Sequence, residues 1–367
     1  MSTKKVLVIT NMYPTEKHKS FGIFVKNQVE ALKRRGLSVD VAAIQNPDSG
    51  KLNVLKKYSS WFFKTILALM TKGKSYDVVH AHYVFPSGLL AYFFKKLFGT
   101  RLIVTAHGGD IDKMARKNKQ IYSLTKKILQ EADQVIAVGQ ELYDTIVDEF
   151  SVPVNRISII NMGVNRDVFK PISKIEARKT CDIKTEEIPI LYVGNLIKQK
   201  GLLELVEAIR LLKKSEPNVR LFLIGPDKDQ SFKKELFERI QQLNINNEVS
   251  YLGVKSQKEI SEWMSASEVF VLPSHIEGFG LVALEAMACG TPVVGTNVGG
   301  LKYLLADGAG KIVPVKDAEA LSEGILHILT SKENKDMLVK NGEEKAEEND
   351  QEQMLNRVIE VYFPTGG

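Results

Sequence analysis

The fold of this chain is decided by residues 269–294, which read VFVLPSHIEGFGLVALEAMACGTPVV. The first four residues are apolar, as in a parallel strand buried on both faces, and Pro273 ends the run. Gly278 and Gly280 allow the next loop to bring its backbone close to a ligand. A helix is expected from about Leu281, and its unpaired first-turn N–H groups favour phosphate or sugar oxygens. The stretch therefore predicts strand, loop, helix and strand in an α/β fold, with a ligand site in the loop.

Two carboxylates lie on either side of this junction between loop and helix. Glu277 is in the loop, and Glu285 is one turn inside the predicted helix, where side chains lean toward the helix N-terminus. We therefore expect both carboxylates to face one ligand from different levels. Spacing alone also permits a plainer interpretation, in which Glu277 complements the helix dipole and Glu285 is a solvated surface residue.

The run HIEGFGLVALEAMACGTPVV closely resembles the signature of the fourth family of retaining nucleotide-sugar glycosyltransferases, with its E-x7-E element at Glu277 and Glu285. The resemblance implies the GT-B fold: two Rossmann-like domains facing a central cleft, with a C-terminal helix that crosses back to the first domain. It also implies that Glu277 lies under the donor sugar at the reacting carbon and that Glu285 binds the ribose. Gly278, Phe279 and Gly280 would then bind the donor sugar.

Length and composition are those of an ordinary enzyme. The 367 residues are enough for two domains, and 44% apolar with 26% charged residues is typical of soluble globular proteins. The two cysteines, Cys181 and Cys289, form no CxxC pair. Neither a disulfide framework nor a zinc site is therefore indicated, and a reducing compartment is expected.

Charge is distributed unevenly along the chain. Residues 1–167 contain 25 Lys+Arg and 14 Asp+Glu, a net +11, whereas residues 168–367 contain 25 and 30, a net −5. A basic first half suits an anionic surface, either a phosphate-bearing acceptor or an acidic lipid. No recognition motif supports a nucleic-acid partner.

The first 44 residues predict a strand, a loop, a helix and a second strand. The turn after the first strand, NMYPT at residues 11–15, lacks the glycine fingerprint of dinucleotide-binding folds, which disfavours NAD. The family usually has a Gly-Gly pair in this first loop, near the donor phosphates. Phe21 and Gly22 stand here instead, so the resemblance assigns only Gly22 to the diphosphate.

Two stretches of the first half, residues 54–72 and 89–98, mix aromatic and aliphatic residues with lysines. Neither is a transmembrane helix, because Lys64 interrupts the first and the second is too short. One interpretation is an amphipathic helix packed on the sheet with its lysines extended to solvent. The other is an interfacial face that docks on a membrane carrying a lipid-linked acceptor.

A histidine and two glycines follow a predicted strand at residues 102–105. The carboxyl end of such a strand is where an α/β sheet presents ligand groups. The segment resembles the family's H-G-x-D-like element, which implies that His107 hydrogen-bonds the donor sugar and makes Asp110 a candidate on the acceptor side. Asp110 and Asp112 also spell D-x-D, which binds metal in other glycosyltransferase folds, but the GT-B resemblance implies no metal.

Residues 161–171, NMGVNRDVFKP, have the turn composition of a linker and resemble the family's interdomain segment. We therefore expect an acceptor-binding domain over residues 1–165, completed by a C-terminal helix at about 351–367. A nucleotide-sugar-binding domain is expected over residues 166–350.

The loop at residues 194–201 follows a predicted strand and precedes a helix. A lysine beside a helix N-terminus can bind a diphosphate, although a solvent-exposed lysine is the plainer alternative. The loop resembles the family pattern G-R-L-x-x-x-K-G, in which Arg and Lys hold the diphosphate. Lys200 matches, whereas Asn195 stands at the Arg position and supplies one charge fewer. By the same resemblance, Val254 lies beside the nucleobase.

Together these features predict a metal-independent retaining hexosyltransferase. It would move a sugar from a nucleotide diphosphate, UDP before GDP or ADP, to a glycan or lipid-linked acceptor in cell-envelope polysaccharide or glycolipid synthesis. The nucleotide sugar is a substrate, so no cofactor is expected. The expected location is the cytoplasm, extending to the inner face of the membrane. The alternatives are a nucleotide-sugar epimerase or phosphorylase of the same fold, and a non-catalytic sugar- or membrane-binding protein.

Overall fold

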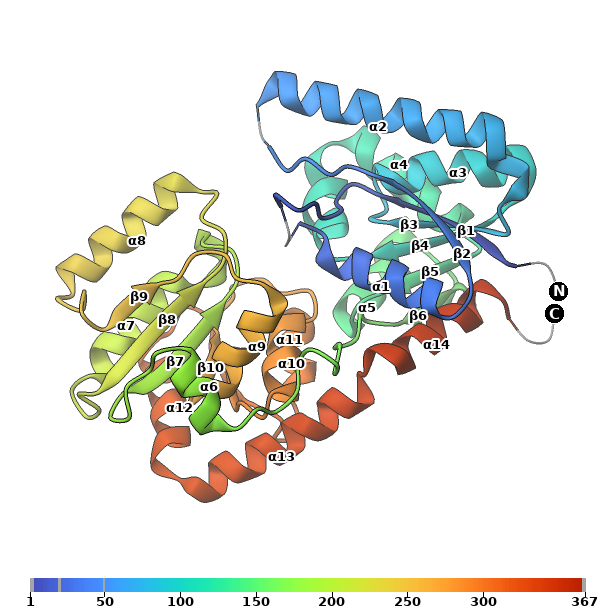
Figure 1. Cartoon of the computed structure of the whole chain (residues 1–367). Coiled ribbons are helices and arrows are strands. Elements are labelled where there is room, and N and C mark those ends of the chain that lie inside the picture. The colour runs from blue at the N-terminus through green and yellow to red at the C-terminus, as the bar shows by residue number, and fades with distance from the viewer. Residues whose placement is uncertain (1–2, 19–20, 49, 365–367) are drawn as a thin grey trace. The chain divides into compact units, whose positions relative to one another are not determined.

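The computed structural model describes residues 3–18, 21–48 and 50–364, and it divides into two compact units (Figure 1). Unit 1 comprises the chain up to Met162 and from Glu352 onward, and unit 2 is Gly163–Gln351. Each unit contains one six-stranded sheet in which every pairing is parallel, with helices on the sheet faces. The predicted α/β class is therefore confirmed.

The sheet of unit 1 has the strand order β2-β1-β3-β4-β5-β6. Its strands are β1 (Lys5–Thr10), β2 (Ser38–Ala43), β3 (Val78–His82), β4 (Arg101–Ala106), β5 (Gln134–Ala137) and β6 (Ile157–Ile159). Its helices are α1 (Ile23–Arg34), α2 (Lys51–Lys72), α3 (Ser87–Phe98), α4 (Lys119–Glu131), α5 (Gln140–Phe150) and α14 (Gln351–Tyr362).

Alternate residues of β1 enter two separate cores, because successive side chains of a strand point to opposite faces of the sheet. Leu7 and Ile9 pack in a core that also contains residues of α2, α3, α4 and α5. Val6 and Val8 pack with α1 and with the last helix, α14. Tyr362 of α14 is fully buried there. The predicted return of the C-terminal helix to the first domain is thus confirmed.

The sheet of unit 2 has the order β12-β11-β10-β7-β8-β9. Its strands are β7 (Ile188–Val193), β8 (Val219–Ile224), β9 (Val249–Tyr251), β10 (Val269–Leu272), β11 (Val293–Thr296) and β12 (Lys311–Val313). Its helices are α6 (Lys174–Thr180), α7 (Leu202–Leu212), α8 (Gln230–Gln242), α9 (Gln257–Ala266), α10 (Leu281–Ala288), α11 (Gly299–Leu304), α12 (Ala318–Thr330) and α13 (Lys332–Glu348). The predicted strand at 269–272 and the helix from Leu281 are confirmed.

Each sheet reverses its strand order at one point, and ligands of open α/β sheets bind beside such a point, at the carboxyl ends of the strands. In unit 1 the reversal lies between β1 and β3, and in unit 2 it lies between β7 and β10. The loops that follow β7 and β10 are therefore neighbours, although about 77 residues separate them in the sequence.

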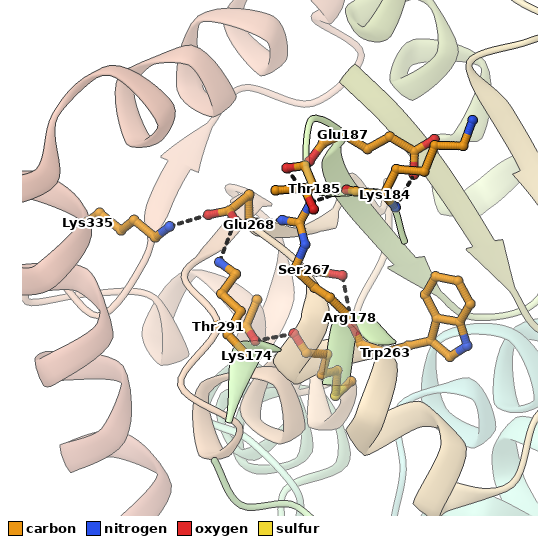
Figure 2. A network of polar contacts seen from close by, with 11 residues as sticks. Lys174, Arg178, Lys184, Thr185, Glu187, Trp263, Ser267, Glu268, Thr291 and Lys335 are labelled. Atoms are coloured by element: carbon orange, nitrogen blue, oxygen red, sulfur yellow. Dashed lines mark hydrogen bonds and ion pairs between the residues drawn. The ribbon is translucent and has the colours of Figure 1, made fainter. Parts of the chain in front are cut away.

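A polar network surrounds the amino end of β10, at the end of the sheet opposite the carboxyl ends of the strands (Figure 2). Glu268 lies just before β10 and forms ion pairs with Lys174 at 2.6 Å, with Arg178 at 3.4 Å and with Lys335. Burial by itself would raise the pKa of Glu268, but the two lysines outweigh it and hold the pKa below its ordinary value. The network ties α6 and α13 to the sheet and has a structural role.

Candidate active site

The loop after β7 reaches the loop after β10 through a glycine. A short 3-10 turn, Lys198–Lys200, leads into Gly201, which has φ +67° and caps α7. A Cβ at Gly201 would lie 1.9 Å from the carbonyl oxygen of Pro273, closer than any side chain allows. The backbone N–H of His275 also donates to the carbonyl of Gln199 at 2.8 Å. Only glycine permits this close approach of the two loops.

The close approach of the two loops brings together Lys200 and Glu277, which the sequence analysis predicted separately as diphosphate and donor-sugar residues. The Nζ of Lys200 lies 2.6 Å from Oε2 of Glu277, and the two side chains are only 20% and 16% exposed. Ser274 Oγ donates to the same carboxylate oxygen at 3.3 Å. Because the pair is partly buried, salt screens it less than a surface ion pair. The Glu277 carboxylate and the Lys200 ammonium group therefore form a fixed ion pair at the point where the strand order reverses.

The carbonyl groups of the Glu277 loop are held from the other side by α11. The backbone N–H of Gly300 points at the carbonyl oxygens of Glu277 (3.3 Å) and Gly278 (3.1 Å). A Cβ at Gly300 would stand 2.3 Å from the Gly278 oxygen. Thr296 Oγ1 also donates to the carbonyl of Ser274 at 2.5 Å. The loop carrying the catalytic candidate is thus fixed by its neighbours in space.

The remaining donor-site candidates of unit 2 also lie in loops that follow the carboxyl ends of strands. Gly280, with φ +91°, caps α10, and Phe279 is half-buried against the unit's core. Asn195 is exposed two residues after the end of β7, and its backbone carbonyl accepts a hydrogen bond from the Tyr192 hydroxyl at 2.9 Å. Val254 is 53% exposed in the loop after β9.

Glu285 lies one turn inside α10, as predicted. Burial raises the pKa of its carboxyl to about 8. No hydrogen bond or ion pair engages that carboxyl among the residues that the structure describes. Glu285 is partly buried on α10, so its carboxyl is neither fully solvated nor enclosed.

Three imidazoles lie together at the carboxyl ends of β3 and β4 in unit 1: His80 and His82 are buried, and His107 is partly buried. His107 directly follows β4, and its Nε2 lies 3.1 Å from Nδ1 of His82, at the end of β3. The rings of Phe24 and Tyr83 lie 5.0 and 4.6 Å from the His107 ring. Burial lowers the pKa of His107 to about 3, so the imidazole is neutral at physiological pH. A neutral imidazole can donate and accept hydrogen bonds without attracting an anion.

The group extends beneath His107 to the C-terminal helix. Nδ1 of His80 lies 2.6 Å from the hydroxyl of Tyr362, and Nε2 of His80 lies 2.7 Å from Oγ1 of Thr105. The rings of His80 and His82 are 4.3 Å apart. Sequence reasoning identified His107 but could not identify Tyr362, because nothing local to α14 indicates a partner 282 residues away.

Asp110 fixes the loop that holds His107. The carboxylate is 2% exposed, and its two oxygens accept the backbone N–H groups of Val84 at 2.8 Å and His107 at 3.0 Å. Burial raises its pKa to about 6. The Asp110 carboxylate therefore points into the protein, and any effect on a bound acceptor would come from the loop conformation that it holds.

Gly22, the diphosphate candidate of unit 1, has φ +74° and caps α1, and a Cβ there would lie 2.5 Å from the Met12 carbonyl oxygen.

Glycosyltransferase family models match both units. Residues 22–168 match the model described as Glycosyltransferase Family 4, and residues 173–345 match the model described as Glycosyl transferases group 1. The chain is 31% identical over 252 residues to a D-inositol 3-phosphate glycosyltransferase of Streptosporangium roseum, a match that covers 65% of this chain and 58% of that relative. It is 26% identical over 357 residues to the putative teichuronic acid biosynthesis glycosyltransferase TuaC of Bacillus subtilis, covering 88% of each.

The solved structure of Anabaena Alr3699/HepE in complex with UDP and glucose aligns with 99% of this chain and 100% of its own. The TM-score is 0.79 at 19% sequence identity. At that identity the alignment establishes a shared fold over the whole chain.

Proposed function

The chain belongs to the family 4 glycosyltransferases and has the GT-B fold, and from this premise we propose that it moves a hexose-type sugar from UDP to a glycan or lipid-linked acceptor with retention of configuration. The pair of Lys200 and Glu277, 2.6 Å apart where the strand order reverses, is the observation that carries the proposal. An ammonium group and a carboxylate held together suit a donor with an anionic leaving group and an electron-poor reacting carbon.

In the proposed reaction, Lys200 and the backbone N–H groups after Glu277 stabilise the diphosphate as the glycosidic bond breaks. Glu277 supports the oxocarbenium-like carbon from below. The acceptor oxygen forms its bond on the face that the diphosphate leaves, and the acceptor proton passes to the released diphosphate. Because Lys200 supplies positive charge at the phosphates, we propose that transfer needs no added metal.

The other candidates take supporting roles in this proposal. Gly22 and Asn195 contact the diphosphate, Glu285 the ribose and Val254 the nucleobase. Residues 278–280 and His107 bind the donor sugar, and the loop fixed by Asp110 belongs to the acceptor side. UDP is favoured because a protein of the same fold binds UDP and glucose. A cell-envelope acceptor is favoured because a relative matched over 88% of its length is named a putative teichuronic acid biosynthesis glycosyltransferase. We place the reaction in the cytoplasm, at the inner face of the membrane.

A thermal-shift panel tests the donor class directly. UDP, GDP and ADP, each alone and as a hexose conjugate, would be added with and without a chelator. We expect UDP and a UDP-hexose to raise the unfolding temperature, by an amount that grows with ligand concentration and is unaffected by chelator. No shift from any nucleotide would contradict the proposal and favour a non-catalytic binding protein.

Following the fate of a labelled UDP-hexose separates the remaining alternatives. A glycosyltransferase releases UDP and delivers label to an added lipid or glycan fraction. An epimerase would change the sugar of the donor without any acceptor, and a phosphorylase would require inorganic phosphate. Either result would overturn the assignment of a transfer reaction.

A further inference from the structure

One side of α2 is apolar although it does not face the core of unit 1. The helix buries Trp61, Thr65 and Leu69, which recur at a spacing of four residues and pack toward the sheet. Another side of the helix is solvent-exposed and apolar, with side chains between 52% and 78% exposed. We call it the α2 stripe, and it consists of Leu52, Leu55, Phe62, Phe63, Leu67 and Met70. Figure 1 shows α2 lying along the outside of unit 1.

Such a stripe is unusual on the surface of a soluble protein. Apolar side chains scattered singly over a surface need no explanation, but a contiguous set that includes two aromatic rings marks an interaction site. The buried face already supplies the contacts that hold α2 on the unit, including a hydrogen bond from Trp61 Nε1 to the Ala42 carbonyl at 2.9 Å. The stripe is therefore not needed to fold unit 1.

The charged residues of the segment that carries the stripe are all of one sign. Residues 49–76 contain six lysines and no Asp or Glu. Lys72 is paired with Asp40 at 3.2 Å, and Lys57 donates to the carbonyls of Asn46 and Asp48. Lys56, Lys64 and Lys74 are exposed and form no ion pair with the described residues.

We propose that α2 docks this protein on a bilayer that contains anionic lipids. The α2 stripe would enter the boundary between headgroups and acyl chains, with the helix lying in the membrane plane. The lysines would extend past the apolar side chains to the lipid phosphates. A helix of 22 residues is about 33 Å long, so its apolar and basic groups can meet many lipids at once.

An anionic bilayer explains the surface better than a second copy of this chain. Two copies joined through the α2 stripe would bring two sets of lysines together with no acidic residue of the same segment to offset them. A lipid surface supplies both an apolar layer and a layer of phosphates.

None of the helices in the described part of the chain has the length and hydropathy needed to cross a membrane.

Co-sedimentation of the full chain with lipid vesicles tests this proposal without any sugar substrate, so the result is independent of the proposed reaction. We expect binding to phosphatidylcholine vesicles containing roughly 30% phosphatidylglycerol and little binding to pure phosphatidylcholine. Phe63→Ser with Met70→Ser should weaken binding by roughly tenfold or more. The control is Ile175→Ser with Met337→Ser, which removes two apolar side chains that are 82% and 50% exposed from unit 2 and should leave binding unchanged.

The lysines are tested separately. Lys56→Gln with Lys74→Gln should weaken binding to anionic vesicles by roughly tenfold, and added salt should weaken binding of the parent chain in the same way. Lys214→Gln with Lys258→Gln removes the same charge from unit 2 and should change binding far less.

A Phe63→Trp variant reports whether the stripe enters the lipid. We expect its emission to move to shorter wavelength on anionic vesicles and to be quenched by brominated acyl chains, whereas the parent protein, with Trp61 buried, changes little. Three results would overturn the proposal: no binding to anionic vesicles, equal losses in the stripe and control variants, or a lipid-free dimer that the Phe63→Ser and Met70→Ser changes dissociate.

Discussion

In both units a glycine with positive φ joins the loop after the first strand to the next helix, but the side chains near that glycine differ in charge. In each, the first strand is followed by a loop and then by a left-handed glycine that caps the next helix, Gly22 in unit 1 and Gly201 in unit 2. Neither glycine has room for a side chain. In unit 2 the adjoining loops carry the ion pair of Lys200 and Glu277, whereas in unit 1 they carry neutral imidazoles around His107.

The difference teaches that the fold supplies the position and the loops supply the chemistry. A charged pair suits a diphosphate and a carbon that becomes positive as its bond breaks. A neutral imidazole suits the hydroxyl groups of a sugar, which carry no charge. The proposed division of labour between the units follows from this contrast.

Removing the charged pair should have the largest effect. Lys200→Ala and Glu277→Gln should each lower the rate of transfer by about 10²- to 10³-fold, because each removes a group that acts on charge developing in the transition state. UDP release from the donor measures the rate, and thermal unfolding checks that the variants fold. Lys198→Ala removes an exposed lysine of the same 3-10 turn and is the matched control. A near-normal rate in either site variant would contradict the assignment.

Filling the two capping glycines should have the next largest effect, and a similar one in each unit. Gly22→Ala and Gly201→Ala should each cost about 2–4 kcal/mol of stability, because both an unfavourable φ and a backbone clash must be relieved. Gly36→Ala, at φ +83° with nothing within 4 Å, meets only the conformational term and should cost about 1 kcal/mol. Hydrogen exchange of peptides from each unit locates the loss. Equal costs at all three positions would show that the close approaches do not matter.

The carboxyl of Glu285 should make stability depend on pH. Its pKa is raised from 4.5 to about 8, so the unfolded chain loses the proton at lower pH than the folded chain. The contribution of Glu285 to stability therefore falls as pH rises from about 4.5 to about 8 and is constant above that range. Relative to wild type, Glu285→Gln should gain on the order of 2 kcal/mol between those limits. Denaturant unfolding at several pH values measures this gain, and Glu333→Gln, at an exposed position, should show none.

The smallest expected effect is that of Tyr362→Phe, which tests the support beneath the imidazoles. Removing the hydroxyl leaves Nδ1 of His80 buried without its partner, at a cost of about 1–2 kcal/mol that should appear in unit 1 alone. Tyr303→Phe, at a half-exposed ring, is the control. An unchanged unit 1 would mean that the hydrogen bond to α14 adds nothing to the stability of this region.

The sequence by itself determined the architecture, because its signals are local. Buried parallel strands are short apolar runs often ended by Gly or Pro, and β10 has the bounds predicted for it, Val269–Leu272. The family signature at residues 269–294 then fixed the GT-B fold. Charge content does not identify the buried side of α13: the helix is highly charged, yet Leu338 and Ala346 are buried, and Gly342 lies against Met287 of α10.

Tertiary structure alone decided which residues meet. Lys200 and Glu277 are 77 residues apart, and His80 and Tyr362 are 282 apart, yet each pair is in hydrogen-bond contact. The sequence named Lys200 and Glu277 as separate candidates, but no periodicity or spacing encodes that β7 lies beside β10. It also left two interpretations of α2 open, and only the structure shows that Trp61 is buried on the unit while Phe63 is exposed. Strand order and packing set these contacts, because they depend on how the whole sheet assembles and not on any short stretch of chain.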